Sequence, residues 1–232
     1  MKVEDFTQCW FAVTIDQQRS RTGPDRVAGL LQVLPEVLGG RARLHPERTA
    51  GDEVQLLTGD AAAVVDVVGW LQREGGWWTG LGIGPVDAPL PASTREARGG
   101  AYLAAREAVE SAKASPVGLV LRGHGTVGGA QYRVPQQHAA DAAAQDAVTR
   151  AESALWLLCE LWQRRSTEGW QMSDLLEQGM GVGQAAQQLG ISASAASQRH
   201  RRAAHETTRR GRELAVDLLE QARAALAAEG PR

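Results

Sequence analysis

The distribution of strand signals along the chain is the feature that most constrains its fold. Up to about residue 132, short apolar runs alternate with amphipathic helical runs, and glycine and proline stand at the joints. From Val134 onward nearly every residue is a good helix former, and no segment has the pattern of a strand. The sequence therefore predicts an α+β domain over residues 1–133 and an all-helical region over residues 141–232.

The N-terminal region contains strand and helix signals in the order βαββαβαβ. Strands are expected at residues 10–16, 42–49, 52–58, 77–84 and 117–123, and helices at residues 25–40, 60–76 and 94–113. The first strand is apolar on both faces, which is typical of a central strand covered by helices. The order includes the βαββαβ unit of a ferredoxin-like or palm sheet.

Charge and cysteine content limit the class of protein. The formal net charge is only -2, so binding to nucleic acid requires a local basic patch. Cys9 and Cys159 lie far apart in apolar surroundings, and the N-terminus lacks the pattern of a signal peptide. No apolar run approaches the roughly 20 residues that cross a bilayer. We expect a cytoplasmic protein that does not enter a membrane.

Two carboxylates stand where a palm sheet would bring them together. The first strand ends on Asp16, and Asp52 follows Gly51 at the tip of the hairpin between the second and third strands. Two carboxylates at one place favour a cation, and oxygen ligands suit Mg²⁺, which also binds nucleotide phosphates. The alternative is a solvated turn, because Gly-Asp is itself a turn dipeptide.

The segment Ala50-Gly51-Asp52-Glu53-Val54 resembles the GGDEF signature of the cyclase and palm superfamily. A closer resemblance is to the SatD family of bacterial proteins, which covers roughly residues 10–122. Four further segments carry it: Asp16 with Ser20-Arg21, residues 80–85 (GLGIGP), residues 98–102 (RGGAY) and residues 105–108 (AREA). The resemblance implies a palm-type domain that holds a metal at Asp16, Asp52 and Glu53.

Departures from the cyclase signature bear on activity. Ala50 replaces its first glycine, Val54 replaces its phenylalanine, and Gln18 stands where cyclases often carry a second aspartate. These changes favour a nucleotide sensor over a working cyclase. Five residues are candidates for nucleotide contacts, either beside Asp16 or as phosphate-binding cations: Ser20, Arg21, Arg95, Arg98 and Lys113. For these cations the alternative is a solvated helix face.

Residues 80–84 (GLGIG) also invite comparison with a phosphate-binding loop. They lie in a predicted strand, however, and no P-loop lysine follows them. We therefore expect these glycines to let a neighbouring element approach closely. The tryptophans, including Trp156, Trp162, Trp77 and Trp78, are expected in the hydrophobic core.

Residues 182–203 (VGQAAQQLGISASAASQRHRRA) resemble a helix-turn-helix of the sigma-region-4 or response-regulator type. A helix-turn-helix needs a small residue where its helices touch, and Ala186 supplies one. Its tight turn needs a residue that accepts φ > 0, and Gly190 fits that position. Ser192 is placed to cap the second helix. The alternative is an alanine-rich helical pair with a charged surface.

The second helix of such a motif lies in the DNA major groove, where Gln suits adenine and Arg suits guanine. The candidate DNA-binding residues are Ser194, Gln198, Arg199, Arg201 and Arg202. Between residues 194 and 211 five arginines stand against Glu206 alone, which predicts a basic patch able to contact phosphates.

Together these features predict a transcription regulator with a nucleotide-sensing palm domain and a DNA-binding tail. The tail is expected to form a homodimer through the helices at residues 141–165 and 206–228, because paired DNA half-sites require two copies. One alternative is a Mg²⁺-dependent nucleotidyl cyclase or nucleotidyltransferase-like enzyme that the helix-turn-helix only localises. Another is a tail that binds protein partners.

Overall fold

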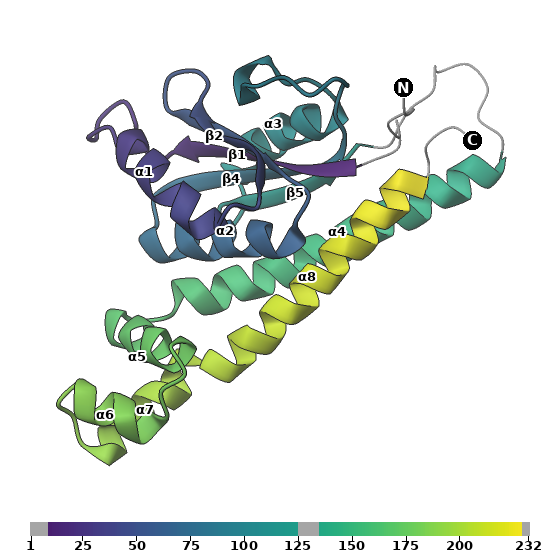
Figure 1. Cartoon of the computed structure of the whole chain (residues 1–232). Helices are drawn as coiled ribbons and strands as arrows, with labels where there is room; N and C mark the ends of the chain where they lie inside the picture. The colour runs from purple at the N-terminus through teal and green to yellow at the C-terminus, as the bar shows by residue number, and fades with distance from the viewer. Residues whose placement is uncertain (1–8, 125–134, 229–232) are drawn as a thin grey trace.

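The computed structural model describes residues 9–124 and 135–228, which form an α+β fold around one five-stranded sheet (Figure 1). The strands are β1 (Cys9–Gln17), β2 (Ala42–Arg48), β3 (Glu53–Thr58), β4 (Trp77–Pro85) and β5 (Leu119–Gly123). The helices are α1 (Val27–Leu38), α2 (Ala61–Glu74), the short 3-10 helix η1 (Thr94–Glu96), α3 (Gly100–Ala112), α4 (Pro135–Gln163), α5 (Thr167–Glu177), α6 (Val182–Gln188), α7 (Ala193–Ala203) and α8 (His205–Ala228). The predicted α+β class is confirmed.

The sheet has the strand order β2-β3-β1-β4-β5, with β1 at its centre. Strand β1 runs antiparallel to both β3 and β4, and β2 runs antiparallel to β3. Strand β5 runs parallel to β4, which its connection through α3 allows. The central place of β1 follows from its sequence, because a strand buried on both faces must be apolar throughout.

One face of the sheet is covered by helices from both ends of the chain. Phe11, Val13 and Ile15 of β1 belong to the same hydrophobic cluster as buried residues of α1, α2, α4 and α8. Helices α4 and α8 lie side by side and antiparallel along this face (Figure 1). The sheet and these helices therefore share one core, which crosses the domain boundary expected near residue 134. We call residues 9–124 with α4 and α8 the sheet body.

The opposite face of the sheet packs against α3, and glycines make that contact close. A Cβ atom on Gly82 would lie 2.0 Å from the carbonyl oxygen of Ala101, and one on Gly80 would lie 2.2 Å from that of Ala105. No side chain fits between β4 and the α3 backbone at these positions. The structural role expected for residues 80–84 is thus confirmed.

Helix α4 also protects the outer edge of the sheet at β5. The carboxylate of Glu152 accepts a hydrogen bond from the backbone N–H of Leu121 (2.9 Å). The indole Nε1 of Trp156 donates to the carbonyl oxygen of Leu119 (3.0 Å). Edge strands present unpaired backbone groups that invite aggregation, and these two side chains satisfy two of them.

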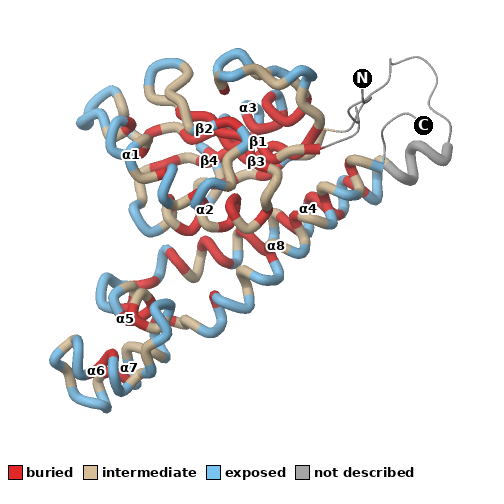
Figure 2. Tube along the Cα trace, in the orientation of Figure 1, coloured by how far each residue is buried: buried red, intermediate tan, exposed pale blue. Residues whose placement is uncertain are grey.

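Helices α5, α6 and α7 form a small unit at one end of the α4 and α8 pair, away from the sheet (Figure 1). We call residues 167–203 the three-helix unit. Its core consists of Met172, Leu175, Ala185, Ala186 and Ala196. Most of its surface is exposed or half-buried, in contrast with the buried strands (Figure 2). In the described residues, no helix is long and apolar enough to span a membrane.

Candidate functional site

The first candidate site is the acidic pair of Asp16 and Asp52. Asp16 lies near the end of β1, opposite Glu53 in the ladder, and Asp52 lies in the turn of the β2–β3 hairpin. Burial raises the pKa of Asp16 above its usual 3.8, and the charge of Asp52 and a hydrogen bond between the two carboxyl groups raise it further. The sequence therefore correctly predicts that these two side chains meet.

The pKa of Asp52 is shifted in the opposite direction. Burial acts to raise it, but hydrogen bonds from the Ser20 hydroxyl, its own backbone amide and the Asp16 carboxyl outweigh burial, and the charge of Lys113 adds to them. The net pKa of Asp52 is lowered. The pKa values of the two carboxyl groups are thus shifted apart, with Asp16 the weaker acid of the pair and Asp52 the stronger.

Lys113, which ends α3, supplies a positive charge to this pair. Its Nζ lies 3.3 Å from Oδ2 of Asp16 and 2.9 Å from Oε1 of Glu110. It also lies 5.8 Å from the ring centroid of Trp78. The lysine that the sequence places among the phosphate-binding cations therefore already neutralises the acidic pair from the α3 side.

Glu53, the third carboxylate of the predicted metal set, is held by another partner. The hydroxyl of Thr49 donates to its Oε1 at 2.6 Å across the hairpin. Among the described residues, no group of three or more His, Cys, Asp or Glu side chains is arranged to hold a metal ion. Asp16 and Asp52 fit Mg²⁺ only as two ligands of an ion whose other ligands are water or phosphate oxygens.

A surface pocket of about 310 Å³ adjoins the acidic pair. It brings together Ser20, Arg21 and Asp52, as the sequence predicts for a nucleotide site. The pocket also contains Arg48, whose Nη1 lies 2.9 Å from Oδ2 of Asp25. No motif marks Arg48, but its position four residues before Asp52 in a predicted hairpin could have indicated it.

Arg95 and Arg98 lie elsewhere, in the segment between β4 and α3, and neither lines this pocket. Both side chains are exposed. The backbone N–H of Arg95 lies 3.3 Å from Oε2 of Glu47, and the carbonyl oxygen of Arg98 accepts from the N–H of Asp87 at 2.9 Å. No contact of the described residues joins either arginine to Asp16 or Asp52.

The second candidate site is the surface of α7. Gly190, in the turn between α6 and α7, has φ +63°, a left-handed conformation that favours glycine. The Ser192 hydroxyl accepts a hydrogen bond from the N–H of Ala195 at 3.2 Å and caps α7. Ala186 and Ala196 are buried where the helices meet. Each of these local features is as the sequence predicts.

Helix α7 carries five exposed polar or basic side chains, which are Ser194, Ser197, Gln198, Arg201 and Arg202. Arg199 differs, because it is half-buried and its charge acts on Glu168 at the start of α5. There the pKa of Glu168 is lowered by its backbone hydrogen bond, by the Ser166 hydroxyl and by the charge of Arg199. Arg199 is therefore partly engaged within the three-helix unit.

The basic patch expected from the sequence is smaller in the structure. Arg209 lies 2.8 Å from Glu206 and 2.5 Å from Glu213, and Arg210 lies 2.9 Å from Glu206. These pairs form along the first two turns of α8, at the i, i+3 and i, i+4 spacing of a helix. The uncompensated positive charge of this region is thus concentrated on α7, at Arg201 and Arg202.

Comparison with protein-family models, with curated proteins and with solved structures finds no match to this chain. Function must therefore be inferred from the two candidate sites themselves, because a fold alone does not determine function.

Proposed function

We propose that the protein is a DNA-binding transcription regulator whose sheet body binds a nucleotide. The observation that carries this proposal is the exposed row Ser194, Gln198, Arg201 and Arg202 on α7. Exposed side chains that both donate and accept hydrogen bonds suit base edges, and guanidinium groups that have no ion-pair partner among the described residues suit phosphates.

The geometry around α7 supports a helix-turn-helix. Helices α6 and α7 are separated by residues 189–192, which contain a glycine with positive φ and a capping serine. Helix α5 packs against α7, so the unit has the three helices that such domains need for a core. Its place at the end of α4 and α8 leaves α7 accessible (Figure 1).

The sheet body supports a palm-type nucleotide site in this proposal. Its β2-β3-β1-β4 order is the order of a split βαβ sheet, and Asp16 and Asp52 meet at one end of it. The proposed ligand contacts Ser20 and Arg21 through its phosphates, and Asp52 would hold the Mg²⁺ ion that accompanies them. The bound metal would supply positive charge to the phosphate oxygens.

Binding to sheared genomic DNA, measured between about 50 and 200 mM KCl, tests the proposed DNA site. We expect binding that weakens steeply with salt. Gln198→Ala and Arg201→Ala should each weaken specific binding by about 1–3 kcal/mol, the typical value of a bidentate base contact. Arg106→Ala is the matched control, because Arg106 is exposed on α3, outside the three-helix unit. Unchanged binding in both α7 variants contradicts the proposal.

The acidic pair also favours a second candidate function, a Mg²⁺-dependent nucleotidyltransferase-like enzyme that α7 brings to DNA. Calorimetry with ATP and GTP, in the presence of Mg²⁺ or EDTA, measures binding to wild type and Asp52→Ala. Metal-dependent binding that Asp52→Ala abolishes supports the nucleotide site. A new nucleotide product that is absent with Asp52→Ala favours the enzyme, and binding without a product favours the sensor.

The proposed regulator is a homodimer, because helix-turn-helix proteins commonly bind paired DNA half-sites with two copies of the chain. Leu157 of α4 and Leu214 of α8 are exposed, at 69% and 53%. Light scattering of Leu157→Glu with Leu214→Glu, compared with wild type, tests whether these side chains hold a homodimer together.

A further inference from the structure

A cavity of about 600 Å³ lies where the sheet body meets the three-helix unit, away from both sites described above. One wall is α2, and the others come from the end of α4, from α5 and from the start of α8. Protein interiors are close-packed, whereas pockets for small ligands typically enclose about 300–1,000 Å³. The size and the position between two parts of the chain are those of a ligand site.

Three of the side chains that line the cavity are tryptophans: Trp70, Trp162 and Trp170. Trp162 is only 3% exposed, and its ring lies against Gly69, where an added Cβ atom would come within 3.3 Å of it. Guanidinium groups of Arg73 and Arg165 lie 5.0 Å and 4.4 Å from the ring centroid of Trp170. Indole rings with flat faces and edges favour a planar aromatic ligand.

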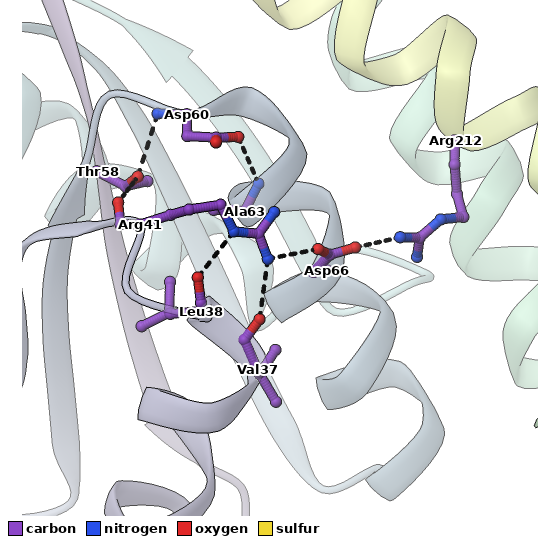
Figure 3. A network of polar contacts seen from close by, with 8 residues as sticks. All are labelled: Val37, Leu38, Arg41, Thr58, Asp60, Ala63, Asp66 and Arg212. Carbon is purple, nitrogen blue, oxygen red and sulfur yellow. Dashed lines mark hydrogen bonds and ion pairs between the residues drawn. The ribbon is translucent and has the colours of Figure 1, made fainter. Parts of the chain in front are cut away.

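Charge on the α2 and α8 side of the cavity is unbalanced. The carboxylate of Asp66 accepts a hydrogen bond from Arg41 of the α1–β2 turn at 2.7 Å and another from Arg212 of α8 (Figure 3). Arg41 is tied in addition to the carbonyl oxygens of Val37 and Leu38. One carboxylate thus pairs with two guanidinium groups, so Arg212 has only a shared ion-pair partner among the described residues.

Each of the other arginines around the cavity has a carboxylate near it. Arg73 pairs with Asp174 through two hydrogen bonds of 2.7 and 2.9 Å, and Arg209 pairs with Glu206 and Glu213. Glu177 lies at the rim, where its charge acts on the buried Arg165, which has no carboxylate within 4.0 Å among the described residues. Among the residues that line the cavity, three arginines face three carboxylates, so the excess of positive charge is local to Arg212, which shares Asp66 with Arg41.

We propose that this cavity binds a planar aromatic anion, with its ring against the tryptophans and its acid group on Arg212. The site does not depend on the proposed DNA or nucleotide functions. Its walls belong both to the sheet body and to the three-helix unit that carries α7, so the ligand contacts both parts at once. A bound ligand therefore changes the free energy of any movement between them.

Three naphthalene derivatives of similar size test the proposal on the wild-type chain. They are naphthalene-1-sulfonate, the neutral naphthalene-1-sulfonamide and the cation 1-naphthylmethylammonium. Calorimetry should give one site per chain for the sulfonate, which should bind at least about 10-fold more tightly than the cation, a difference of 1.4 kcal/mol. Binding should quench tryptophan fluorescence. Equal affinities, tighter binding of the cation, or no saturable binding overturns the proposal.

Matched arginine variants locate the site. Arg212→Gln should weaken sulfonate binding about 10-fold or more, because it removes the proposed contact to the acid group. Arg223→Gln, on the same helix but paired with Glu220 and lying over Phe11, should bind like wild type. Equal losses in the two variants, or none in Arg212→Gln, contradict the assignment.

Trp70→Leu removes an aromatic wall without touching the charge network and should weaken all three naphthalenes alike. Retained sulfonate affinity in this variant places the ligand elsewhere. Circular dichroism of each variant confirms that it is folded before binding is measured. Asp52→Ala should leave sulfonate binding unchanged, which separates this site from the proposed nucleotide pocket.

Discussion

The sheet body and the three-helix unit are built from different kinds of side chain. The largest fully buried side chains, from Phe11 to Leu155, all belong to the sheet body. Buried alanines form much of the core of the three-helix unit, with Met172 and Leu175 as its larger members. Burial of apolar area is the main source of stability, so the body is the more stable part. The proposed recognition helix is thus carried by the part that opens most readily.

The largest expected effect comes from a pair of glycine substitutions. Gly82→Ala places a Cβ atom 2.0 Å from a backbone oxygen of α3, which cannot move aside as a flexible side chain could. We expect a loss of more than about 4 kcal/mol in the free energy of unfolding, or failure to fold. Gly183→Ala, on α6, meets nothing within 4 Å and should be neutral or stabilising. Urea denaturation measures both, and a tolerated Gly82→Ala contradicts the close packing of α3.

Met172→Ala should break the three-helix unit while leaving the sheet body folded. Met172 is fully buried in α5, and removing such a side chain typically costs about 2–5 kcal/mol. A core this small cannot absorb that loss, whereas the separate core of the body is untouched. Hydrogen exchange should show lost protection in residues 167–203 and retained protection in β1 and β4. Loss of protection in both parts would mean that they unfold as one unit.

Two helix N-caps offer a matched pair of substitutions, and removing either cap should cost about 1 kcal/mol of stability. The Asp60 carboxylate caps α2 by accepting from the N–H of Ala63 (2.9 Å), and the Ser192 hydroxyl caps α7. Asp60→Ala should lower the global stability measured in urea. Ser192→Ala should mainly increase hydrogen exchange in α7. Equal effects of both on global stability would show that the two parts share one cooperative transition.

The acidic pair predicts a small gain of stability on substitution. The fold raises the pKa of Asp16, so its contribution to stability is complete below pH 3.8 and is lost as the pH rises through the raised pKa. Asp16→Asn avoids this loss, and we expect its Tm to exceed that of wild type by about 1–2 °C at pH 7. In thermal scans from pH 3 to pH 7, the difference in Tm between Asp16→Asn and wild type should disappear toward pH 3. A difference in Tm that stays constant across this pH range would show that titration of Asp16 does not cause it.

The smallest effect concerns the contact between the two parts. Arg73 and Asp174 form a two-bonded ion pair, but their side chains are 38% and 35% exposed, so solvent screens it. A double-mutant cycle of Arg73→Ala and Asp174→Ala should give a coupling energy below about 0.5 kcal/mol. A coupling of several kcal/mol would show instead that the two parts are locked together.

Local sequence features predicted much of this structure. Every expected strand and helix of residues 10–123 is present, because apolar periodicity and glycine joints act over a few residues. The helix expected from residue 94 begins later, at Gly100, after the 3-10 turn η1. Gly190 and Ser192 were predicted for the same reason, since turn and cap chemistry is local. The meeting of Asp16 and Asp52 followed from the strand order.

Contacts between segments far apart in the sequence could not be predicted. Nothing in residues 141–163 indicates that Glu152 and Trp156 bind the edge of β5. The pairing of Lys113 with Asp16 joins the end of α3 to the end of β1 and leaves no local pattern. The cavity depends on the relative placement of α2, α5 and α8, which only tertiary packing determines.

The chain enters the three-helix unit from α4 and leaves it into α8, and the entry and exit are tied together. Nε of Arg165 donates to the carbonyl oxygen of Ala203 at 2.8 Å, and its Nη2 donates to the hydroxyl of Thr208 at 2.7 Å. The unit is therefore an insertion between two helices of the sheet body rather than a terminal appendage. A short glycine-serine loop in place of residues 166–204 should leave an intact body, and a different helical module could be exchanged at the same two points.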